Sequence, residues 1–306
     1  MNNQNTIAII ACLKMEELYI KEWLDYHIKI GVDHFYLCDN NDSDYSPKLS
    51  DVVSEYIDNG IVEVFDYNGV HPIQPSCYQD IYEKYGDIYD WYMVIDIDEF
   101  LDIPITNNDL KKFLYRLDKY NKDYVALMWR QYDDNDLLEY DGRGCLERFT
   151  RPATCFKDGV WNIIDGVSLK TKSLFRNKRY IYEKYKVLPF INHQHCAFSP
   201  KLGIQRYDVL GNKINNKTFI SIKKSYETEY ANKIYNICYL KHFYCKTIQE
   251  FIEFKINRGD TLQLKDANEY PYNLGRFFGK SQETPEKDKY LYEHYGIKRG
   301  KYADYK

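Results

Sequence analysis

The sequence predicts an α/β protein built on an open, mainly parallel sheet with helices on its faces. Three features lead to this class: short apolar runs, amphipathic stretches that separate them, and one apolar run that ends in three carboxylates. Alternating strands and helices require crossover connections, which are right-handed and make consecutive strands parallel. Ligands of such sheets bind at the carboxyl ends of the strands. We therefore expect the functional side chains to follow the strands directly.

The N-terminal part of the chain has a β–α–β–α–β pattern. We expect its three strands at residues 6–13, 34–38 and 61–65. The first helix, over residues 16–30, has apolar side chains at i, i+3, i+4, i+7 and i+8 and ends at Gly31. The second helix has its apolar stripe between Leu49 and Ile57 and ends at Gly60.

The fourth expected strand carries the most informative feature of the chain. A helix over residues 75–85 leads into the run Trp91–Leu101, whose aromatic and β-branched residues indicate a buried strand. Asp96, Asp98 and Glu99 then fall at the carboxyl end of that strand. While the backbone stays extended, Asp96 and Asp98 point the same way and can bind one cation. Oxygen ligands of this kind suit Mg²⁺ or Mn²⁺, which keeps coordination positions for substrate phosphates.

The Asp-x-Asp spacing is weak evidence by itself, because it recurs at Asp42/Asp44 and Asp134/Asp136 among polar, loop-like neighbours. At Asp96 and Asp98 the preceding apolar strand changes the interpretation. Burying two carboxylates beside a third without a cation would be costly, through mutual repulsion and loss of solvation. The sequence therefore predicts a metal site at this strand end.

The pattern loosens after a helix at residues 110–117 and a strand at residues 124–129. Residues 130–166 are rich in Asp, Gly and Arg without periodicity, which is typical of a substrate-facing loop region. Residues 170–186 are basic and aromatic; we expect a solvated face, with contact to phosphates or an anionic membrane as the alternative. Thr247 and Glu250 form a capping box that opens a helix ending at Gly259. From Ser281 onward we expect a polar surface tail.

Composition excludes several classes of protein. With 306 residues and 44% hydrophobic content, the chain can bury one large core. It has no apolar run near the roughly 18 residues of a membrane span and no basic start typical of a signal peptide, so we expect a cytoplasmic protein. Its eight cysteines are scattered without a Cys-x-x-Cys pair, which indicates reduced core thiols. The formal net charge of −4 gives no reason to expect nucleic acid as a partner.

Several stretches together resemble the GT-A glycosyltransferases, and more narrowly the bacterial group related to family 2 and to the galactan-synthase-like family 92. The matching stretches are Met15-Glu16 through Glu22-Trp23-Leu24 and His27, Gly31-Val32-Asp33-His34 through Asp39-Asn40 and Ser43, Trp91 to Leu101, and His242 to Lys246 through Phe251, Lys255, Arg258 and Gly259. The resemblance implies a GT-A fold, a Rossmann-like mixed sheet flanked by helices, with a C-terminal helical extension.

The chain departs from this family at two places. The family usually has asparagine before the glutamate that follows the first strand, and here that position is Met15. This departure calls into question one of the polar contacts that the family makes near the nucleotide. The region from Trp129 to Asp136 lacks the glycines expected there, which indicates a specialised acceptor side.

The resemblance implies a nucleotide-sugar-binding half at residues 1–129, an acceptor-side and metal-completing half at 130–260, and a tail at 261–306. It assigns the nucleotide to Glu16, Asp39, Asp96, Lys246 and Arg258, with Asp96 contacting ribose or metal. Lys255 is a further candidate for the diphosphate. The implied metal ligands are Asp96, Asp98 and His242, and His195, which follows His193 by two residues on an apparent strand, is the alternative to His242.

The expected activity is metal-dependent transfer of a hexose from a nucleotide sugar, UDP-linked, to a glycan or glycolipid acceptor with inversion. The cofactors would be Mn²⁺ or Mg²⁺ and the donor. Surface polysaccharide or lipopolysaccharide synthesis is the expected context, in the cytoplasm or at the inner face of the cell membrane. An inverting enzyme needs a carboxylate base at the acceptor hydroxyl. The candidates are Asp133, Asp134, Asp136 and Asp165, among which the sequence does not choose.

Two other functions compete with this one. A non-catalytic carbohydrate-binding or scaffold protein can keep the same fold, although it has no need for buried carboxylates at a strand end. A sugar nucleotidyltransferase would need a glycine-rich phosphate loop after the first strand, where this chain has Leu13-Lys14-Met15-Glu16.

Overall fold

The computed structural model describes residues 5–70, 74–153, 167–193, 195–214, 227–256 and 269–298. The chain divides into two compact units, of which the first contains residues 1–129 and 169–240 and the second residues 130–168 and 241–306. The boundary falls inside continuous strands, among them β6 (Tyr124–Gln131) and β10 (Tyr239–His242), whose last two residues each are counted with the second unit. The first unit thus combines the N-terminal half with a later segment.

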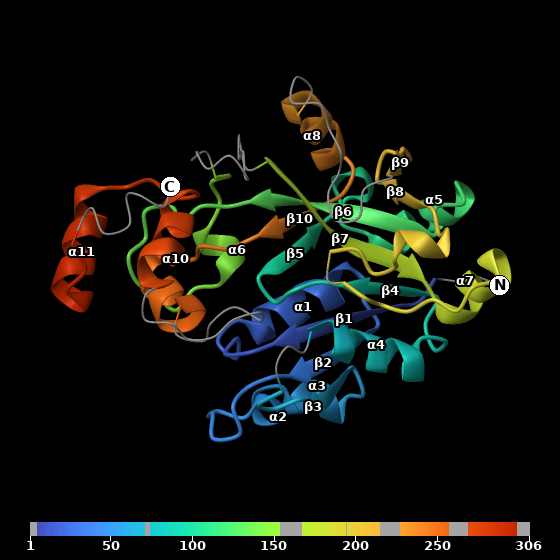
Figure 1. The fold of residues 1–306 in the computed structure, drawn as a ribbon, viewed down its shortest axis with the longest axis horizontal. Helices are drawn as coiled ribbons and strands as arrows, with labels where there is room; N and C mark the ends of the chain where they lie inside the picture. Colours follow the sequence, from blue (N-terminus) through green and yellow to red (C-terminus); the bar gives the residue numbers. More distant parts are fainter. Residues whose placement is uncertain are drawn as a thin grey trace. The chain divides into compact units, whose positions relative to one another are not determined.

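A mixed sheet forms the centre of the first unit (Figure 1). Its other strands are β1 (Ile7–Leu13), β2 (His34–Asp39), β3 (Val62–Asp66), β4 (Trp91–Val94), β5 (Glu99–Asp102), β7 (Val167–Arg176), β8 (Arg206–Asp208) and β9 (Lys213–Ile214). The order is β3-β2-β1-β4-β7-β6-β10-β5, with β8 beside β6 and β9 beside β8. Strand β1 is parallel to β2 and β4, and β3 is parallel to β2, whereas β7 runs antiparallel to β4. The predicted mixed, mainly parallel α/β sheet is confirmed.

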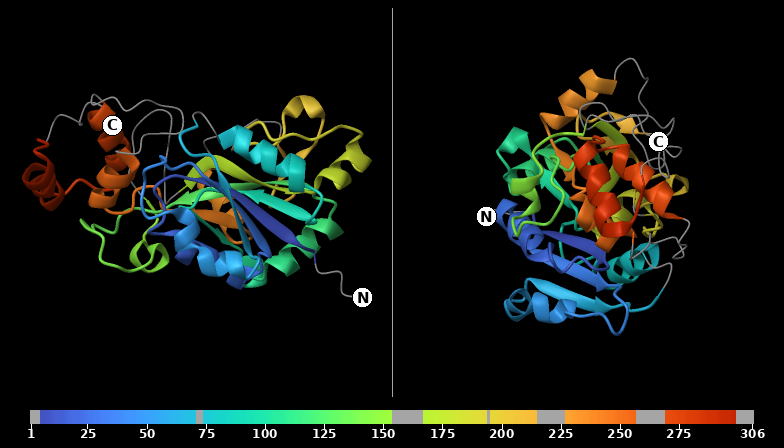
Figure 2. Two further views of the ribbon diagram at one scale, coloured as in Figure 1. Left: turned by 90° about the horizontal axis from the view of Figure 1, so that it is seen from below. Right: turned by 90° about the vertical axis from the view of Figure 1, so that its left-hand side faces the viewer.

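Helices cover both faces of this sheet (Figure 2). They are α1 (Ile20–Ile30), α2 (Leu49–Val52), α3 (Ser54–Asp58), α4 (Gln74–Tyr85), α5 (Leu110–Lys119), α7 (Lys178–Tyr185) and α8 (Glu227–Tyr235), with short 3-10 turns η1 (Pro104–Thr106) and η2 (Pro200–Leu202). Alternation along β1 explains the two layers, because Ala8, Ile10 and Cys12 face a core that includes α4 and α7. Trp23 of α1 packs edge-on against Phe35 of β2.

The second unit is mainly helical. Its elements are α6 (Cys145–Arg148), α9 (Ile248–Glu250), the π-helical segment η4 (Phe251–Ile256), α10 (Glu269–Phe278) and α11 (Pro285–Tyr295). The predicted capping box is present, since the Thr247 hydroxyl accepts from Glu250 N and the Glu250 carboxylate accepts from Thr247 N. The surface tail expected from Ser281 is wrong, because α11 has Lys287 and Leu291 fully buried. The predicted helix end at Gly259 lies outside the described residues.

Three predicted element boundaries are also wrong. The first helix begins at Ile20 rather than near residue 16, because Met15 adopts a left-handed backbone with φ 54° and the chain turns before the helix starts. The second helix is interrupted at Val53, which has non-helical dihedrals between α2 and α3. The fourth strand ends at Val94, and β5 is a separate strand.

Helix α1 is tied to β5 by side chains that bond to strand backbone. Trp23 Nε1 donates to Glu99 O at 2.8 Å, and Tyr26 Oη donates to Leu101 O at 2.7 Å. His27 Nε2 accepts from Leu101 N at 3.3 Å, so its Nδ1 carries the proton and donates to Trp23 O at 2.8 Å. Burial lowers the pKa of His27 to about 3. A neutral, fully buried imidazole therefore helps to fix the strand that begins with Glu99.

This imidazole predicts an acid-dependent loss of stability. The folded pKa of His27 lies below the unfolded value of 6.5, so the unfolded chain binds the proton first and stability falls as the pH drops from 6.5 toward 3. Between pH 6.5 and pH 5 we expect His27 to account for on the order of 2 kcal/mol. Urea unfolding of wild type and His27→Gln at several pH values measures this difference. The pKa of His195 is also lowered by burial, and its contribution to the pH dependence of stability is the same in both proteins. Equal slopes in the two proteins would contradict the prediction.

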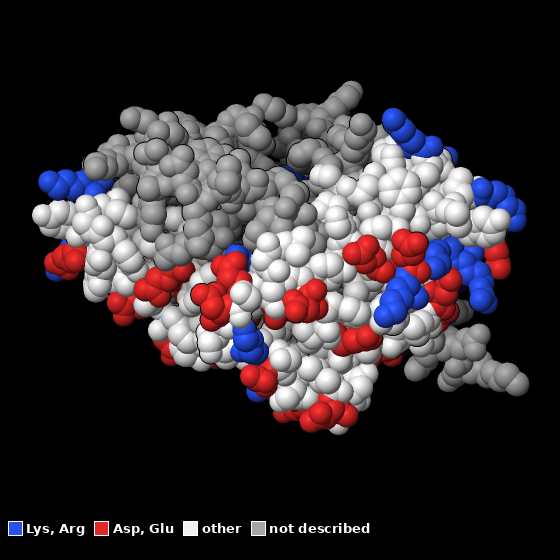
Figure 3. Space-filling model, turned by 60° about the horizontal axis from the view of Figure 1, so that its bottom comes forward, with Lys and Arg blue, Asp and Glu red and all other residues white. Residues whose placement is uncertain are grey.

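Two surface properties bear on partners. No helix in the described part of the chain is long and apolar enough to span a bilayer. On the face drawn in Figure 3, acidic and basic side chains of the described residues are interspersed, as expected for a net charge of −4. Among the described residues on that face, the basic side chains therefore form no continuous surface.

Candidate functional site

The acidic stretch predicted to end a strand forms a tight turn between β4 and β5. Glu99 N donates to Asp96 O at 3.1 Å, and Asp96 N donates to the Glu99 carboxylate at 3.0 Å. The backbone is therefore not extended from Asp96 to Asp98. The expectation that an extended backbone makes their side chains point the same way is wrong. Asp98 and Glu99 are buried, whereas the Asp96 side chain keeps 28% of its surface exposed.

A buried lysine lies beside this turn. Strand β7 pairs with β4 so that Ser173 faces Val94, which places the preceding residue, Lys172, where β4 ends. Lys172 is fully buried, with Nζ 2.7 Å from Asp96 Oδ2 and 3.6 Å from Glu99 Oε1. Burial disfavours the charged ammonium, but Asp96 and Glu99 outweigh it and raise the pKa of Lys172. The solvated face expected over residues 170–186 is wrong at this position.

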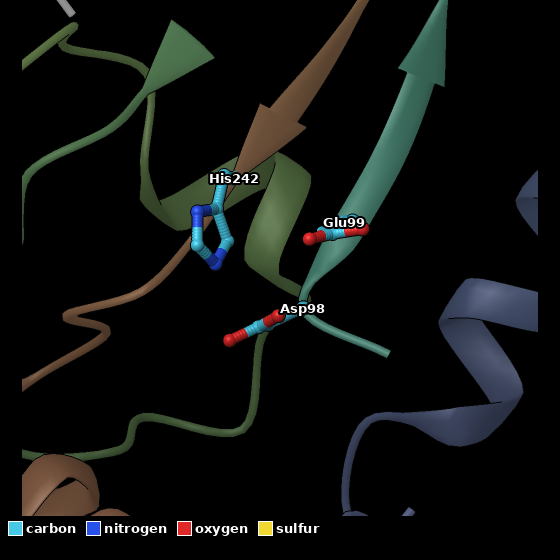
Figure 4. A group of neighbouring side chains, drawn as sticks. All are labelled: Asp98, Glu99 and His242. Atoms are coloured by element: carbon cyan, nitrogen blue, oxygen red, sulfur yellow. The ribbon is translucent and has the colours of Figure 1, made fainter. Parts of the chain in front are cut away.

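Three buried side chains converge at the sheet, as Figure 4 shows. Asp98 precedes β5, Glu99 begins it, and His242 ends β10. Each offers one ligand atom, and these atoms lie within 4.8 Å of one another. Two carboxylates and an imidazole form a donor set that suits Mn²⁺ and related divalent ions. Asp96 and His195 do not belong to this group.

The surroundings of two buried oxygen atoms are consistent with a cation bound at this group. Burial raises the pKa of Glu99 well above its usual range, Lys172 opposes the shift, and Asp96 and Asp98 add to it. Glu99 Oε1 makes no hydrogen bond within the described part of the chain. A divalent ion would favour the ionised form of Glu99 and would give its Oε1 a partner, since the ion supplies positive charge to a buried oxygen that has no hydrogen bond.

The second buried atom is Oε1 of Gln131, whose Nε2 lies 2.7 Å from Nδ1 of His242. An imidazole that binds metal through Nε2 needs an acceptor at Nδ1. Turning the Gln131 amide end for end exchanges Nε2 with Oε1 and supplies this acceptor, because the two ends of an amide have the same shape. Gln131 Oε1 is otherwise buried without a hydrogen bond to any described residue.

The residues expected at the nucleotide follow β1 and β2, which are adjacent parallel strands. Asp39 ends β2, is 8% exposed and accepts from Asn41 N at 3.0 Å. Asn41 Oδ1 accepts from Met15 N at 2.7 Å, which joins the loop after β2 to the loop after β1. Glu16 is buried in that second loop. The structure thus brings Glu16 and Asp39 to the same edge of the sheet.

The alternative histidines are engaged elsewhere. His193 and His195 do not lie on a strand, because only an isolated bridge joins Ile191 to Phe198 around them. His195 is buried against the Trp129 ring, and its Nδ1 lies 3.0 Å from Thr171 O. Burial lowers the pKa of His195 to about 2, with help from the charge of Lys172. This imidazole is therefore a neutral donor to the backbone.

The three described base candidates share an ion network in the second unit. Arg151 contacts Asp133 at 2.6 Å and Asp136 at 2.9 Å, and Lys287 contacts Asp134 at 2.7 Å and Asp136 at 3.0 Å. The side chains of Asp133 and Asp134 are 1% and 0% exposed, whereas that of Asp136 is 41% exposed. Asp165 lies outside the described residues.

The pKa values of this network follow its burial. Burial raises the pKa of Asp133 and of Asp134 against the pull of their cationic partners. Burial also acts on Asp136, but the hydrogen bonds from Lys287 and Arg151 outweigh it and lower its pKa. Asp136 is therefore ionised at neutral pH and is the one carboxylate of the described network that solvent reaches.

The expected diphosphate contacts are only partly described. Lys246 is buried, with a left-handed backbone at φ 51°. Lys255 donates to Tyr244 O at 2.9 Å, and its ammonium lies 3.9 Å from the centre of the Tyr244 ring. Arg258 lies outside the described residues.

Sequence reasoning missed three residues of this site. Lys172 looked like part of a basic surface, Gln131 carried no motif, and Glu99 was noted as a carboxylate but not as a ligand. Only the strand pairing that brings β7 beside β4 could have identified Lys172, and a single sequence does not contain that pairing.

The comparison with known families decides the identity of the chain. Residues 9–276 match the model of glycosyltransferase family 92. The chain belongs to this family. It is a glycosyltransferase, and its sheet is of the mixed, mainly parallel α/β kind that the sequence predicts. An enzyme of this class takes a sugar donor and an acceptor, and the acidic group at the sheet end is its candidate metal site.

Several solved structures are similar to this family 92 chain. One is S. aureus TarS residues 1–349, at 12% identity and a TM-score of 0.39, covering 90% of this chain and 79% of that one. A second is the mannosyltransferase PcManGT from Pyrobaculum calidifontis in complex with GDP-Man and Mn²⁺, at 10% identity and a TM-score of 0.34, covering 42% of this chain and 37% of that one. A third is GalNAc-T7 with UDP, GalNAc and Mn²⁺, at 14% identity and a TM-score of 0.30, covering 44% of this chain and 24% of that one. No curated relative matches the chain.

Proposed function

We propose that this family 92 enzyme moves a hexose from a UDP-linked sugar to a glycan or glycolipid acceptor and requires Mn²⁺ or Mg²⁺. The observation that carries the proposal is the convergence of Asp98, Glu99 and His242, all buried and within 4.8 Å. Such a cluster at a sheet end is costly without a cation. When bound, the cation would stabilise the negative charge that develops on the leaving diphosphate.

The donor nucleotide occupies the edge formed by the loops after β1 and β2 in this proposal. Asp39 and Glu16 are buried carboxylates at that edge, and they accept hydrogen bonds from the ribose and base. Asp96, at the neighbouring strand end, completes the nucleotide contacts. Lys246 and Arg258 neutralise the diphosphate, whose charge one divalent ion alone would leave partly uncompensated.

The acceptor hydroxyl needs a carboxylate that can take its proton. Among the described candidates, Asp136 is the one whose side chain reaches solvent, whereas Asp133 and Asp134 are held in buried ion pairs. We therefore propose Asp136 as the base of an inverting transfer. Its lowered pKa keeps it ionised but makes it a weak base, so Asp165 is the second candidate.

Surface polysaccharide or lipopolysaccharide synthesis is the proposed context, with the enzyme at the cytoplasmic side of the cell. The proposal rests on the class of donor and acceptor rather than on a membrane-binding feature of the described residues.

Release of nucleoside diphosphate tests the activity. The purified chain is incubated with UDP- and GDP-sugars, with Mn²⁺ or with EDTA, and diphosphate release is followed by a coupled assay. We expect slow release from at least one UDP-hexose with Mn²⁺ and none with EDTA. Equal release with EDTA would remove the metal requirement, and no release from any donor would favour the scaffold function.

A further inference from the structure

The environment of Lys172 separates the roles of the three carboxylates in the β4–β5 turn. Lys172 contacts Asp96 at 2.7 Å and Glu99 at the longer distance of 3.6 Å. Asp98 and Glu99 lie in the group that can hold a metal, and Asp96 does not. The closest partner of Asp96 is therefore a fixed cation of the protein itself.

Charge counting agrees with this separation. Asp96, Asp98 and Glu99 supply three negative charges when all are ionised, and Lys172 supplies one positive charge, which leaves a net of two. One divalent ion balances that remainder. Lys172 lies closer to Asp96 than to Glu99, so its repulsion of a metal ion would be strongest at Asp96, where like charges repel at low dielectric.

Asp96 retains acceptor capacity that no described residue uses. An ionised carboxylate has about four acceptor positions. Its Oδ2 bonds to Lys172, and its Oδ1 has no hydrogen-bond partner among the described residues. Lys172 is fully buried, whereas the Asp96 side chain is 28% exposed. The carboxylate is thus anchored from the protein interior, keeps one buried oxygen without a hydrogen bond to a described residue, and belongs to a side chain that solvent partly reaches.

We propose that Lys172 is a positioning residue, which holds Asp96 away from the metal and fixes its carboxylate as a hydrogen-bond acceptor for the ribose hydroxyls of the donor nucleotide. This inference rests on the proposed function and decides between the two roles, ribose or metal, that the sequence left open for Asp96. The hydrogen bond to a charged acceptor gives the enzyme a preference for nucleotides that keep their ribose hydroxyls.

Charge-matched variants test the proposal. Asp96→Asn/Lys172→Met removes one charge of each sign, so it leaves the net charge and the metal ligands unchanged. Lys172→Met removes the anchor alone, and Asp98→Asn removes a proposed metal ligand. Lys184→Met is the matched control, because it breaks another lysine–aspartate pair, with Asp123 at 3.1 Å, away from the acidic group.

Two readouts apply to each variant. The first is Mn²⁺ affinity without nucleotide, from calorimetry or electron paramagnetic resonance. The second is the ratio of the affinities for UDP and 2′,3′-dideoxy-UDP in the presence of Mn²⁺. A variant that is merely less stable would weaken both nucleotides equally, so the ratio reports on positioning rather than on folding.

We expect wild type and Lys184→Met to prefer UDP by about tenfold, the factor that corresponds to one hydrogen bond to a charged group. In Lys172→Met the ratio should fall below about three. The double variant should bind Mn²⁺ within about threefold of wild type and show no preference between the nucleotides, whereas Asp98→Asn should weaken Mn²⁺ by about 100-fold.

Loss of Mn²⁺ binding in the double variant, as large as in Asp98→Asn, would make Asp96 a metal ligand and overturn the inference. An unchanged UDP preference in Lys172→Met would overturn it as well. If wild type itself binds no Mn²⁺, the proposed function fails first. Because removing one partner of a buried pair can unfold a protein, the double variant gives the Mn²⁺ result even where Lys172→Met does not fold.

Discussion

Asp98→Asn should lower turnover of the nucleotide-sugar donor by about 1000-fold or more, with the fold retained. Asp98 is 4% exposed and belongs to the convergent group with Glu99 and His242. The amide keeps the shape of the carboxylate but removes its charge, so the cation is held weakly. Loss of metal-dependent stabilisation of several kcal/mol corresponds to this factor. The measurement is diphosphate release with Mn²⁺ at saturating donor.

Asp102→Asn is the matched control for this prediction. Asp102 is also a buried aspartate, and it ends β5, which Asp98 precedes; its carboxylate accepts from Tyr239 Oη at 2.9 Å. We expect its turnover to stay within about threefold of wild type. Similar losses in the two variants would show that burial, and not metal binding, explains the effect of Asp98→Asn.

Lys287→Met should destabilise the second unit by about 3–5 kcal/mol, the usual cost of removing one partner of a buried ion pair. Lys287 and Asp134 are both fully buried and 2.7 Å apart, and the same ammonium bonds to Ser281 Oγ and Gln282 O at 2.8 Å. Methionine has a similar length, so the change mainly leaves an unpaired carboxylate. Urea unfolding with hydrogen exchange of residues 285–295 measures the loss.

Two companion variants interpret the Lys287 result. Asp134→Asn/Lys287→Met removes both charges and should recover most of the stability. Lys289→Met breaks an exposed pair with Glu293 on the same helix and should cost less than about 1 kcal/mol. If Lys287→Met is as stable as Lys289→Met, α11 is not held by the buried network.

Local patterns explain why much of the fold could be predicted from the sequence. The period of the apolar residues in α1, α4 and α5 and the continuous apolar runs of β1 and β2 depend on burial of one face or of both. The stop at Gly31 was also predictable, because it needs a left-handed residue, with φ 112°, which glycine adopts freely.

What the sequence could not provide was set by contacts between distant residues. The run ending in Leu101 looks like one strand, yet the hydrogen bonds between Asp96 and Glu99 turn it into two. Residues from Ser281 look polar enough for a surface tail, but Lys287 finds carboxylates at Asp134 and Asp136. Glu99 can be buried because a local turn gives its carboxylate a hydrogen-bond donor, and Lys287 can be buried because carboxylates far along the chain accept from its ammonium.

The acidic group was predictable in part for the same reason. An apolar run that ends in carboxylates marks Asp98 without knowledge of the fold, and the resemblance adds His242. The division of labour between Asp96 and Glu99 depends on Lys172, whose position follows from the pairing of β4 with β7. Residue type alone does not distinguish a ligand from its neighbour.

The most direct test of the account is calorimetric titration of UDP into the wild-type chain with Mn²⁺ and with EDTA, repeated on Asp98→Ala. The account predicts UDP binding that requires Mn²⁺ and is lost in Asp98→Ala. UDP binding of equal strength in EDTA, or the absence of metal-linked binding of UDP to the wild type, would contradict the claim that this sheet end holds a metal–nucleotide complex.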